Sequence, residues 1–168
     1  MRHAHALAAA LLAAAPPAAA AECPAAAHAP PLTWRDEGLG LRLDHPPVFV
    51  PDPGSVPEGG GSTRFWTPDR RATAVVNAAR AERGTTLAQL LREAEGDVVQ
   101  NAGGEITYRR QRDNWFVLSG YMAGRIFYRR TLLTAEGVAA TLWMEFPRDM
   151  RPCLDHAVTV MSLSFRGR

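Results

Sequence analysis

Four runs of strand-forming residues, separated only by short turns, restrict the fold more than any other feature of this sequence. The runs are Glu105–Gln111, Asn114–Met122, Arg125–Leu133 and Gly137–Phe146. Turns as short as Arg112-Asp113 and Ala123-Gly124 join antiparallel neighbours, because a parallel crossover needs a dozen residues or more. The second half of the chain is therefore predicted to form an antiparallel meander.

The strand expected at residues 115–122 is apolar on both of its faces. Alternation places one set of side chains together, namely Trp115, Val117 and Tyr121. The opposite face carries Phe116, Leu118 and Met122. A strand of an antiparallel sheet with one face in water alternates cleanly between apolar and polar residues, and this strand does not. Both faces of the sheet must therefore be covered, most simply by helices.

Two segments have the pattern of such helices. Thr86 and Gln89 have the spacing of a capping box, which predicts a helix from residue 87 to about Gly96. Its apolar stripe would be Leu87, Leu90, Leu91 and Ala94. Near the C-terminus, Pro152 suits the first turn of a second helix. The stripe of that helix would be Leu154, Val158, Met161 and Phe165.

Earlier strands complete the predicted fold. Residues 40–45 alternate as a first strand, and residues 63–67 and 72–78 have the pattern of a hairpin. Residues 51–61 are rich in Pro and Gly and predict a loop. The fold class expected is α+β: an antiparallel sheet of six or seven strands flanked by helices, as in an α/β/α sandwich.

The N-terminus has the order of a secretory signal peptide. Arg2 precedes an apolar run at 6–15, and small residues lead to a cleavage site after Ala21 or one residue earlier. We expect residues 1–21 to be the signal peptide, 22–37 an extended lead-in and 38–168 one domain. The apolar run is too short to span a bilayer, and no later run is long enough for an anchor. The mature protein is thus expected in the periplasm or secreted.

Two cysteines, Cys23 and Cys153, remain after this cleavage. In an oxidising compartment such a pair is expected to form a disulfide. The alternative is a Zn(II) or Cu(I) site in which reduced Cys153 and His156, with Cys23 and His28 brought near, act as ligands. That alternative needs free thiolates, which export disfavours.

Charge and motifs exclude several functions. The chain has no Lys, and removing Arg2 leaves 18 Arg against 17 acidic residues, so nucleic acid is not an expected partner. The adjacent pairs Asp44-His45 and Asp155-His156 cannot aim both side chains at one point. No nucleophile elbow, zinc-protease motif or phosphate-binding loop is present. We expect a protein that is not an enzyme and needs no cofactor.

Arginines and tyrosines are interleaved on neighbouring strands of the predicted meander. The candidate ligand or partner face consists of Tyr108, Arg110, Tyr121, Tyr128 and Arg130. Arg and Tyr together favour an anion or an acidic partner, because the guanidinium group offers a planar fork of donors. The alternative is a solvated sheet edge whose charges prevent unwanted strand pairing.

The alternating segment Gly40-Leu41-Arg42-Leu43-Asp44-His45-Pro46, the long meander and the closing helix that ends at Ser164-Phe165 resemble the PsbP-like superfamily. His45 stands where that superfamily tends to have an aromatic residue. The resemblance implies an accessory or protein-interaction domain with a partner in the bacterial envelope. Two alternatives stay open: a small-ligand or anion-binding protein that uses the Arg/Tyr face, and a Cys/His metal-binding protein.

Overall fold

The computed structural model describes residues 23–55 and 61–168. The predicted signal peptide, residues 1–21, lies outside the described residues. Within the described residues, no helix is long and apolar enough to cross a membrane.

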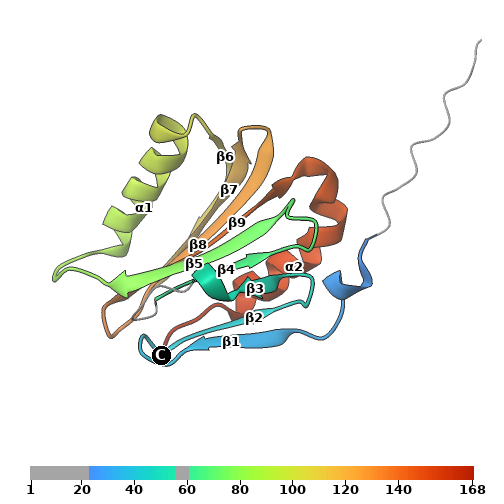
Figure 1. The fold of residues 1–168 in the computed structure, drawn as a ribbon. Coiled ribbons are helices and arrows are strands. Elements are labelled where there is room, and N and C mark those ends of the chain that lie inside the picture. The colour runs from blue at the N-terminus through green and yellow to red at the C-terminus, as the bar shows by residue number, and fades with distance from the viewer. Residues whose placement is uncertain (1–22, 56–60) are drawn as a thin grey trace, which may run out of the picture.

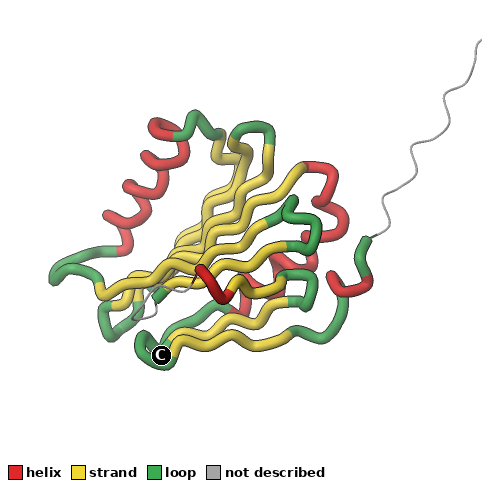
Figure 2. Tube along the Cα trace, in the orientation of Figure 1, coloured by secondary structure: helices red, strands yellow, loops and turns green. Residues whose placement is uncertain are grey.

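A seven-stranded antiparallel sheet forms the centre of the molecule (Figures 1 and 2). Its strands follow the order β3-β4-β5-β9-β8-β7-β6. They are β3 (Val50–Asp52), β4 (Ser62–Trp66), β5 (Thr73–Arg80), β6 (Glu105–Gln111), β7 (Trp115–Met122), β8 (Arg125–Leu133) and β9 (Val138–Pro147). The predicted meander is confirmed as β6 to β9, and the predicted hairpin as β4 and β5. The α+β fold class is likewise confirmed.

A separate two-stranded sheet joins β1 (Leu32–Asp36) to β2 (Leu41–His45). The segment expected to be an extended lead-in therefore contains a strand, in which Trp34 lies opposite Leu43. The strand expected at residues 40–45 is β2, and it lies outside the main sheet. A third difference is β3, which includes Pro51 and falls partly in the expected loop; it lies at the sheet edge, where Pro is tolerated.

Each face of the main sheet has its own apolar core. On one face, α1 (Leu87–Gly96) packs Leu91 and Ala94 against Phe116, Leu118 and other residues of β7 and β8. On the other face, α2 (Arg151–Ser164) and the β1-β2 sheet cover a larger core. Its strand residues include Leu142, Met144 and Phe146. The prediction that both faces are covered is confirmed.

Both helices begin where the sequence predicted. The capping box is present: the backbone N–H of Gln89 donates to Thr86 Oγ1, and the N–H of Thr86 donates to Gln89 Oε1. After Gly96 the chain continues through a π-helical turn, Asp97–Asn101. In α2, Pro152 lies in the first turn, and Met161 is fully buried as expected.

The disulfide joins Cys23 to Cys153, with 5.0 Å between their Cα atoms. It ties the turn at Ala25–Ala27 to the first turn of α2. The two cysteines are 130 residues apart in sequence. Closing a loop of that length restricts the unfolded chain and stabilises the fold by roughly 4–5 kcal/mol in the entropic account.

His45 occupies a core position, as an aromatic residue would. Its side chain is only 3 % exposed, and its ring lies 4.7 Å from that of Phe65. Burial lowers the pKa of His45, against the opposing effect of its hydrogen bond with the Pro46 carbonyl. The folded protein therefore holds this ring neutral at pH values where the unfolded chain binds a proton.

We expect His45 to make stability depend on pH in the range below about pH 7. The folded-state pKa lies below the unfolded value, so stability is fully present above about pH 6.5 and falls as the pH decreases through that value. In His45→Phe the free energy of unfolding should change less across this interval. Urea denaturation at several pH values measures the difference, and an identical slope in both proteins would contradict the assignment.

Candidate binding face

The five predicted Arg and Tyr residues all lie on the α2 side of the sheet. Tyr108 and Tyr128 are both paired with Ser119, one on each side of β7. Arg110 and Arg130 are paired in the same way with Val117. Tyr121 lies two residues beyond Ser119 and therefore shares its face. We call Tyr108, Arg110, Tyr121, Tyr128 and Arg130 the Tyr/Arg face.

Trp115 lies between the two arginines of this face. The guanidinium carbon of Arg130 is 4.2 Å from the centre of the indole ring, and that of Arg110 is 5.9 Å away. These are cation–π distances. Among the described residues, neither arginine forms an ion pair, and the buried Arg130 Nε has no hydrogen-bond partner. Burial lowers the pKa of Arg130. The site therefore has donors that no carboxylate of the described chain satisfies.

Tyr128 connects this face to α2. Its hydroxyl group hydrogen-bonds to that of Ser162, a buried residue in the last turns of the helix. Burial raises the pKa of Tyr128, so the phenol stays protonated at neutral pH. Tyr128 is thus a positioned hydrogen-bonding group rather than a base.

Tyr121 and Tyr128 also line a small pocket between the sheet and α2. The pocket has a volume of about 140 Å³, and Val158 and Arg151 contribute to its helix side. The guanidinium group of Arg148 lies 3.9 Å from the centre of the Tyr121 ring. By contrast, Tyr108 is 48 % exposed on the outermost strand. The five residues therefore range from half-buried to exposed.

Three arginines of the meander strands, Arg109, Arg125 and Arg129, lie on the opposite, α1 side, and each has an acidic partner. Arg109 Nε is 3.0 Å from Glu95 Oε1, and Arg129 Nη1 is 3.5 Å from Asp97 Oδ2. Arg125 pairs with Glu145. The arginines of these strands are thus divided between two faces, and those on the α2 side, Arg110 and Arg130, lack carboxylate partners in the described chain. Arg112, in the turn after β6, also lacks one.

The cysteine and histidine candidates also come together. Both sulfur atoms form the disulfide, so Cys153 is not a thiolate in this structure. The rings of His28 and His156 lie 5.3 Å apart beside it. No group of three or more His, Cys, Asp or Glu side chains suited to a metal ion occurs among residues 23–55 and 61–168.

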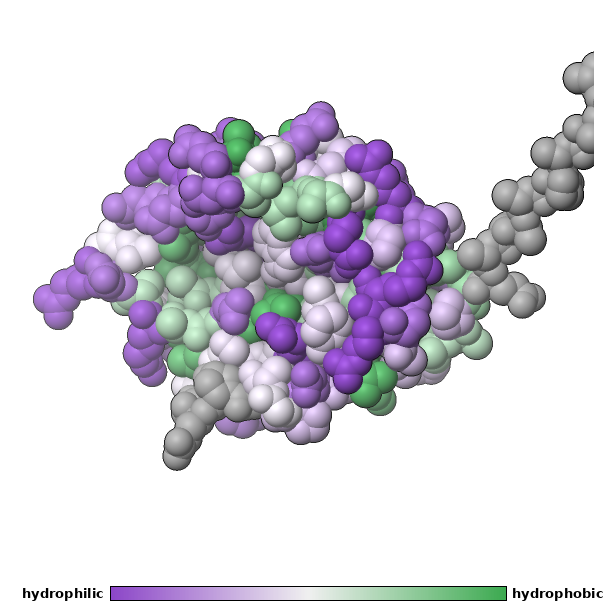
Figure 3. Space-filling model, turned by 45° about the horizontal axis from the view of Figure 1, so that its top comes forward, coloured by the Kyte–Doolittle hydropathy of each residue, from purple (hydrophilic) through white to green (hydrophobic). Residues whose placement is uncertain are grey.

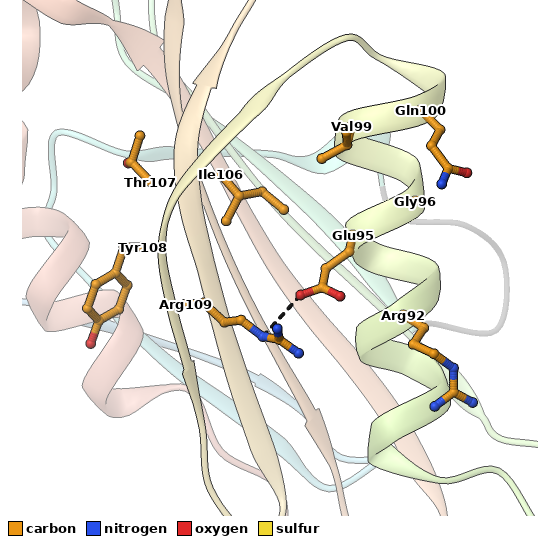
Figure 4. A pocket seen from close by; sticks show the side chains of 9 residues that line it. All are labelled: Arg92, Glu95, Gly96, Val99, Gln100, Ile106, Thr107, Tyr108 and Arg109. Carbon is orange, nitrogen blue, oxygen red and sulfur yellow. Dashed lines mark ion pairs between the residues drawn. The ribbon is translucent and has the colours of Figure 1, made fainter.

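Two features were not expected from the sequence. A second Arg–Trp cluster places the guanidinium carbons of Arg64 and Arg70 5.6 and 5.3 Å from the ring of Trp66. A groove of about 680 Å³ also separates α1 from β6 (Figure 4). Neither could be anticipated, because both depend on which elements become neighbours in space.

The surface seen in Figure 3 is mostly hydrophilic, and its apolar residues form small separate patches. On that face, recognition through one broad apolar surface is not favoured.

Comparison with known proteins gives a fold but no sequence relative. No protein-family model and no curated protein sequence matches the chain. The solution structure of cyanobacterial PsbP (CyanoP) from Synechocystis sp. PCC 6803 matches with a TM-score of 0.64 and 16 % identity, over 88 % of this chain and 98 % of that one. The Ran-binding protein Mog1p of Saccharomyces cerevisiae matches with a TM-score of 0.61 and 10 % identity, over 82 % and 95 %. The chain has the PsbP-like fold.

Replacing Tyr128 by Phe tests the connection between this face and α2. The substitution leaves the Ser162 hydroxyl without its phenol partner in a buried site, so the free energy of unfolding should fall by about 1–2 kcal/mol. Chemical denaturation measures the change. Tyr108→Phe is the matched control on an exposed tyrosine, and its free energy of unfolding should be nearly unchanged. Equal losses of free energy of unfolding in both variants would show that the Tyr128–Ser162 hydrogen bond does not stabilise the fold.

Proposed function

We propose that this chain is an exported, non-enzymatic interaction domain of the bacterial envelope and that its Tyr/Arg face binds an acidic protein partner. The proposal rests on the position of Trp115 between Arg110 and Arg130. The guanidinium groups of these two arginines have no carboxylate partner among the described residues. Arg110 is exposed and Arg130 is half-buried, so a carboxylate from a partner would supply the ionic partner that these two guanidinium groups lack among the described residues.

The residue types of the face favour a protein as the ligand. Trp, Tyr and Arg are the side chains that most often dominate the energy of protein interfaces. Here they extend across three adjacent strands, with the open Tyr108 at the outer end and the anchored Tyr128 at the inner end. Mog1p, which has the same fold, is a Ran-binding protein, and this supports a protein-binding role for the fold without identifying the partner.

Binding rather than catalysis agrees with the chemistry of the face. Guanidinium groups stay charged, and burial keeps the Tyr128 phenol protonated at neutral pH. These groups donate hydrogen bonds and attract anions, but none of them is a nucleophile or a base under these conditions. Such a face holds a ligand without transforming it.

Export to the envelope is supported by the N-terminal sequence pattern and by the disulfide, which persists in oxidising compartments. We expect intact-mass measurement of the protein purified from a bacterial periplasm to give a chain that starts at Glu22 or at Ala21. Reduction should add two mass units, because one disulfide becomes two thiols. A full-length chain retained in the cytoplasm would contradict export.

A second candidate is a small anion as the ligand. The unpaired guanidinium groups of Arg110 and Arg130 favour it, because a single carboxylate or phosphate could pair with them without a protein interface. The two candidates differ in affinity: a small anion would bind as tightly when free as when carried by a peptide.

Removing one guanidinium tests the face directly. Trp fluorescence of the full disulfide-bonded chain can follow titration with an acetylated decaglutamate peptide, and with free glutamate and phosphate. In Arg130→Gln we expect affinity for the peptide to fall about tenfold or more, the size of a lost charge-assisted hydrogen bond. Arg83→Gln, which removes an exposed charge before α1, is the matched control and should bind as the parent does.

The outcomes separate the candidates. Equal peptide affinity in Arg130→Gln and in the parent chain would refute the proposal that the Tyr/Arg face is the binding site. Free glutamate or phosphate binding as tightly as the peptide, with the same dependence on Arg130, would favour the small-anion candidate.

A further inference from the structure

The sheet ends in β6, a seven-residue strand with a neighbour on one side only in the described chain. An edge strand presents a row of backbone N–H and C=O groups that can pair with another strand. The opposite edge is protected, because β3 has three residues and contains Pro51. β6 contains no proline, and most of its residues are exposed.

The groove beside this edge lies between β6 and α1. Figure 4 shows Ile106 and Arg109 directed from the strand toward the helix, while Tyr108 points away. Val99, 50 % exposed in the turn after α1, lies across from Ile106 and gives the groove an apolar end. The Arg109–Glu95 ion pair bridges the strand and the helix. A helix lying beside an open strand edge is an arrangement that can hold an extended peptide.

We propose that an extended acidic segment of the partner adds to β6 as an eighth strand of the sheet. This inference rests on the proposed function, since it specifies how the acidic partner engages the protein. Alternate side chains of the added strand would face opposite sides of the sheet. One set would lie beside Arg109 on the side of the groove, and the other would lie next to Tyr108 and Arg110 at the outer end of the Tyr/Arg face.

Charge identifies the occupant as acidic. Arg92 lines the groove, and Arg110 and Arg112 lie on and just after β6. None of the three forms an ion pair with another described residue. Glu95 is already paired with Arg109. Acidic side chains on the added strand would therefore meet cations with no competing carboxylate partner.

The same charges argue against a second copy of this chain as the occupant. If the regular parts of two β6 strands, residues 108–111, paired antiparallel about their centres, Arg109 of each chain would lie directly opposite Arg110 of the other. Like charges on directly opposed strand positions are destabilising. The edge therefore favours an acidic strand over its own copy.

A β-bulge determines which part of β6 can pair. The register with β7 shifts between Ile106 and Tyr108, so Thr107 is the extra residue. Opposite the bulge stands Gly120, where an added Cβ would lie 1.8 Å from the Glu105 carbonyl oxygen. The regular part of the strand runs from Tyr108 to Gln111, and the added strand would pair there.

Three peptides test the mode of binding. The probe is an acetylated, amidated nonapeptide of alternating Glu and Val, titrated into the isotope-labelled full chain and followed by NMR. We expect the amide signals of β6 and α1 to shift and hydrogen exchange of the outward β6 amides to slow. The same peptide N-methylated at alternate residues keeps its side chains but loses backbone donors, and should bind at least tenfold more weakly. A peptide with Lys in place of Glu should not bind.

Variants place the peptide in the groove. Arg92→Glu reverses a charge that lines it, and should weaken binding by about fivefold or more. Arg83→Glu makes the same change in the exposed turn before α1 and should have little effect.

The results distinguish this inference from the function on which it rests. If binding depends on Arg130 but not on N-methylation, the Tyr/Arg face is the site and strand addition is refuted. If binding depends on N-methylation and Arg92 but not on Arg130, the result supports strand addition to β6 and refutes the Tyr/Arg face as the binding site. Pairing of β6 with a second copy, seen as a dimer that the peptide does not dissociate, would overturn the choice of occupant.

Discussion

The fold depends on the apolar character of both faces of its central strands. Phe116 and Leu118 on β7 point to one side, and Leu142 and Met144 on β9 point to the other. Removing the apolar side chains of both faces from water requires a layer of structure packed on each face. α1 supplies one, and α2 with the β1-β2 sheet supplies the other; the disulfide then fixes α2 to the N-terminal segment. The remaining turns and loops connect the strands and helices of these layers.

Features that arise from local pattern could be predicted, and features that arise from long-range pairing could not. The capping box of Thr86 and Gln89 and the alternation of β6 to β9 are local, and both are confirmed. The pairing of Trp34 with Leu43 is not visible in a lead-in rich in Ala and Pro. Which strands lie at the edges depends on the order of the whole sheet, so the groove beside β6 had no sequence signal.

The Tyr/Arg face was predictable because it follows from parity within a meander. Residues two apart on a strand share a face, and short turns keep neighbouring strands in register, so Tyr108, Arg110, Tyr128 and Arg130 had to gather together. The position of Trp115 between two guanidinium groups was beyond this argument. It depends on side-chain packing at the end of β7, for which alternation carries no information.

The two Arg-Arg pairs show how a sheet can assign different roles to adjacent residues. In Arg109-Arg110 and Arg129-Arg130, the first residue faces α1, where Glu95 or Asp97 neutralises it. The second faces the α2 side and lies against Trp115 instead of a carboxylate. One arginine of each pair therefore forms an ion pair with an acidic residue on the α1 side, while the other has no carboxylate partner among the described residues. Because the division follows from strand alternation alone, shifting the register of β6 or β8 by one residue would exchange the two arginines of a pair between the faces and divide the Tyr/Arg face.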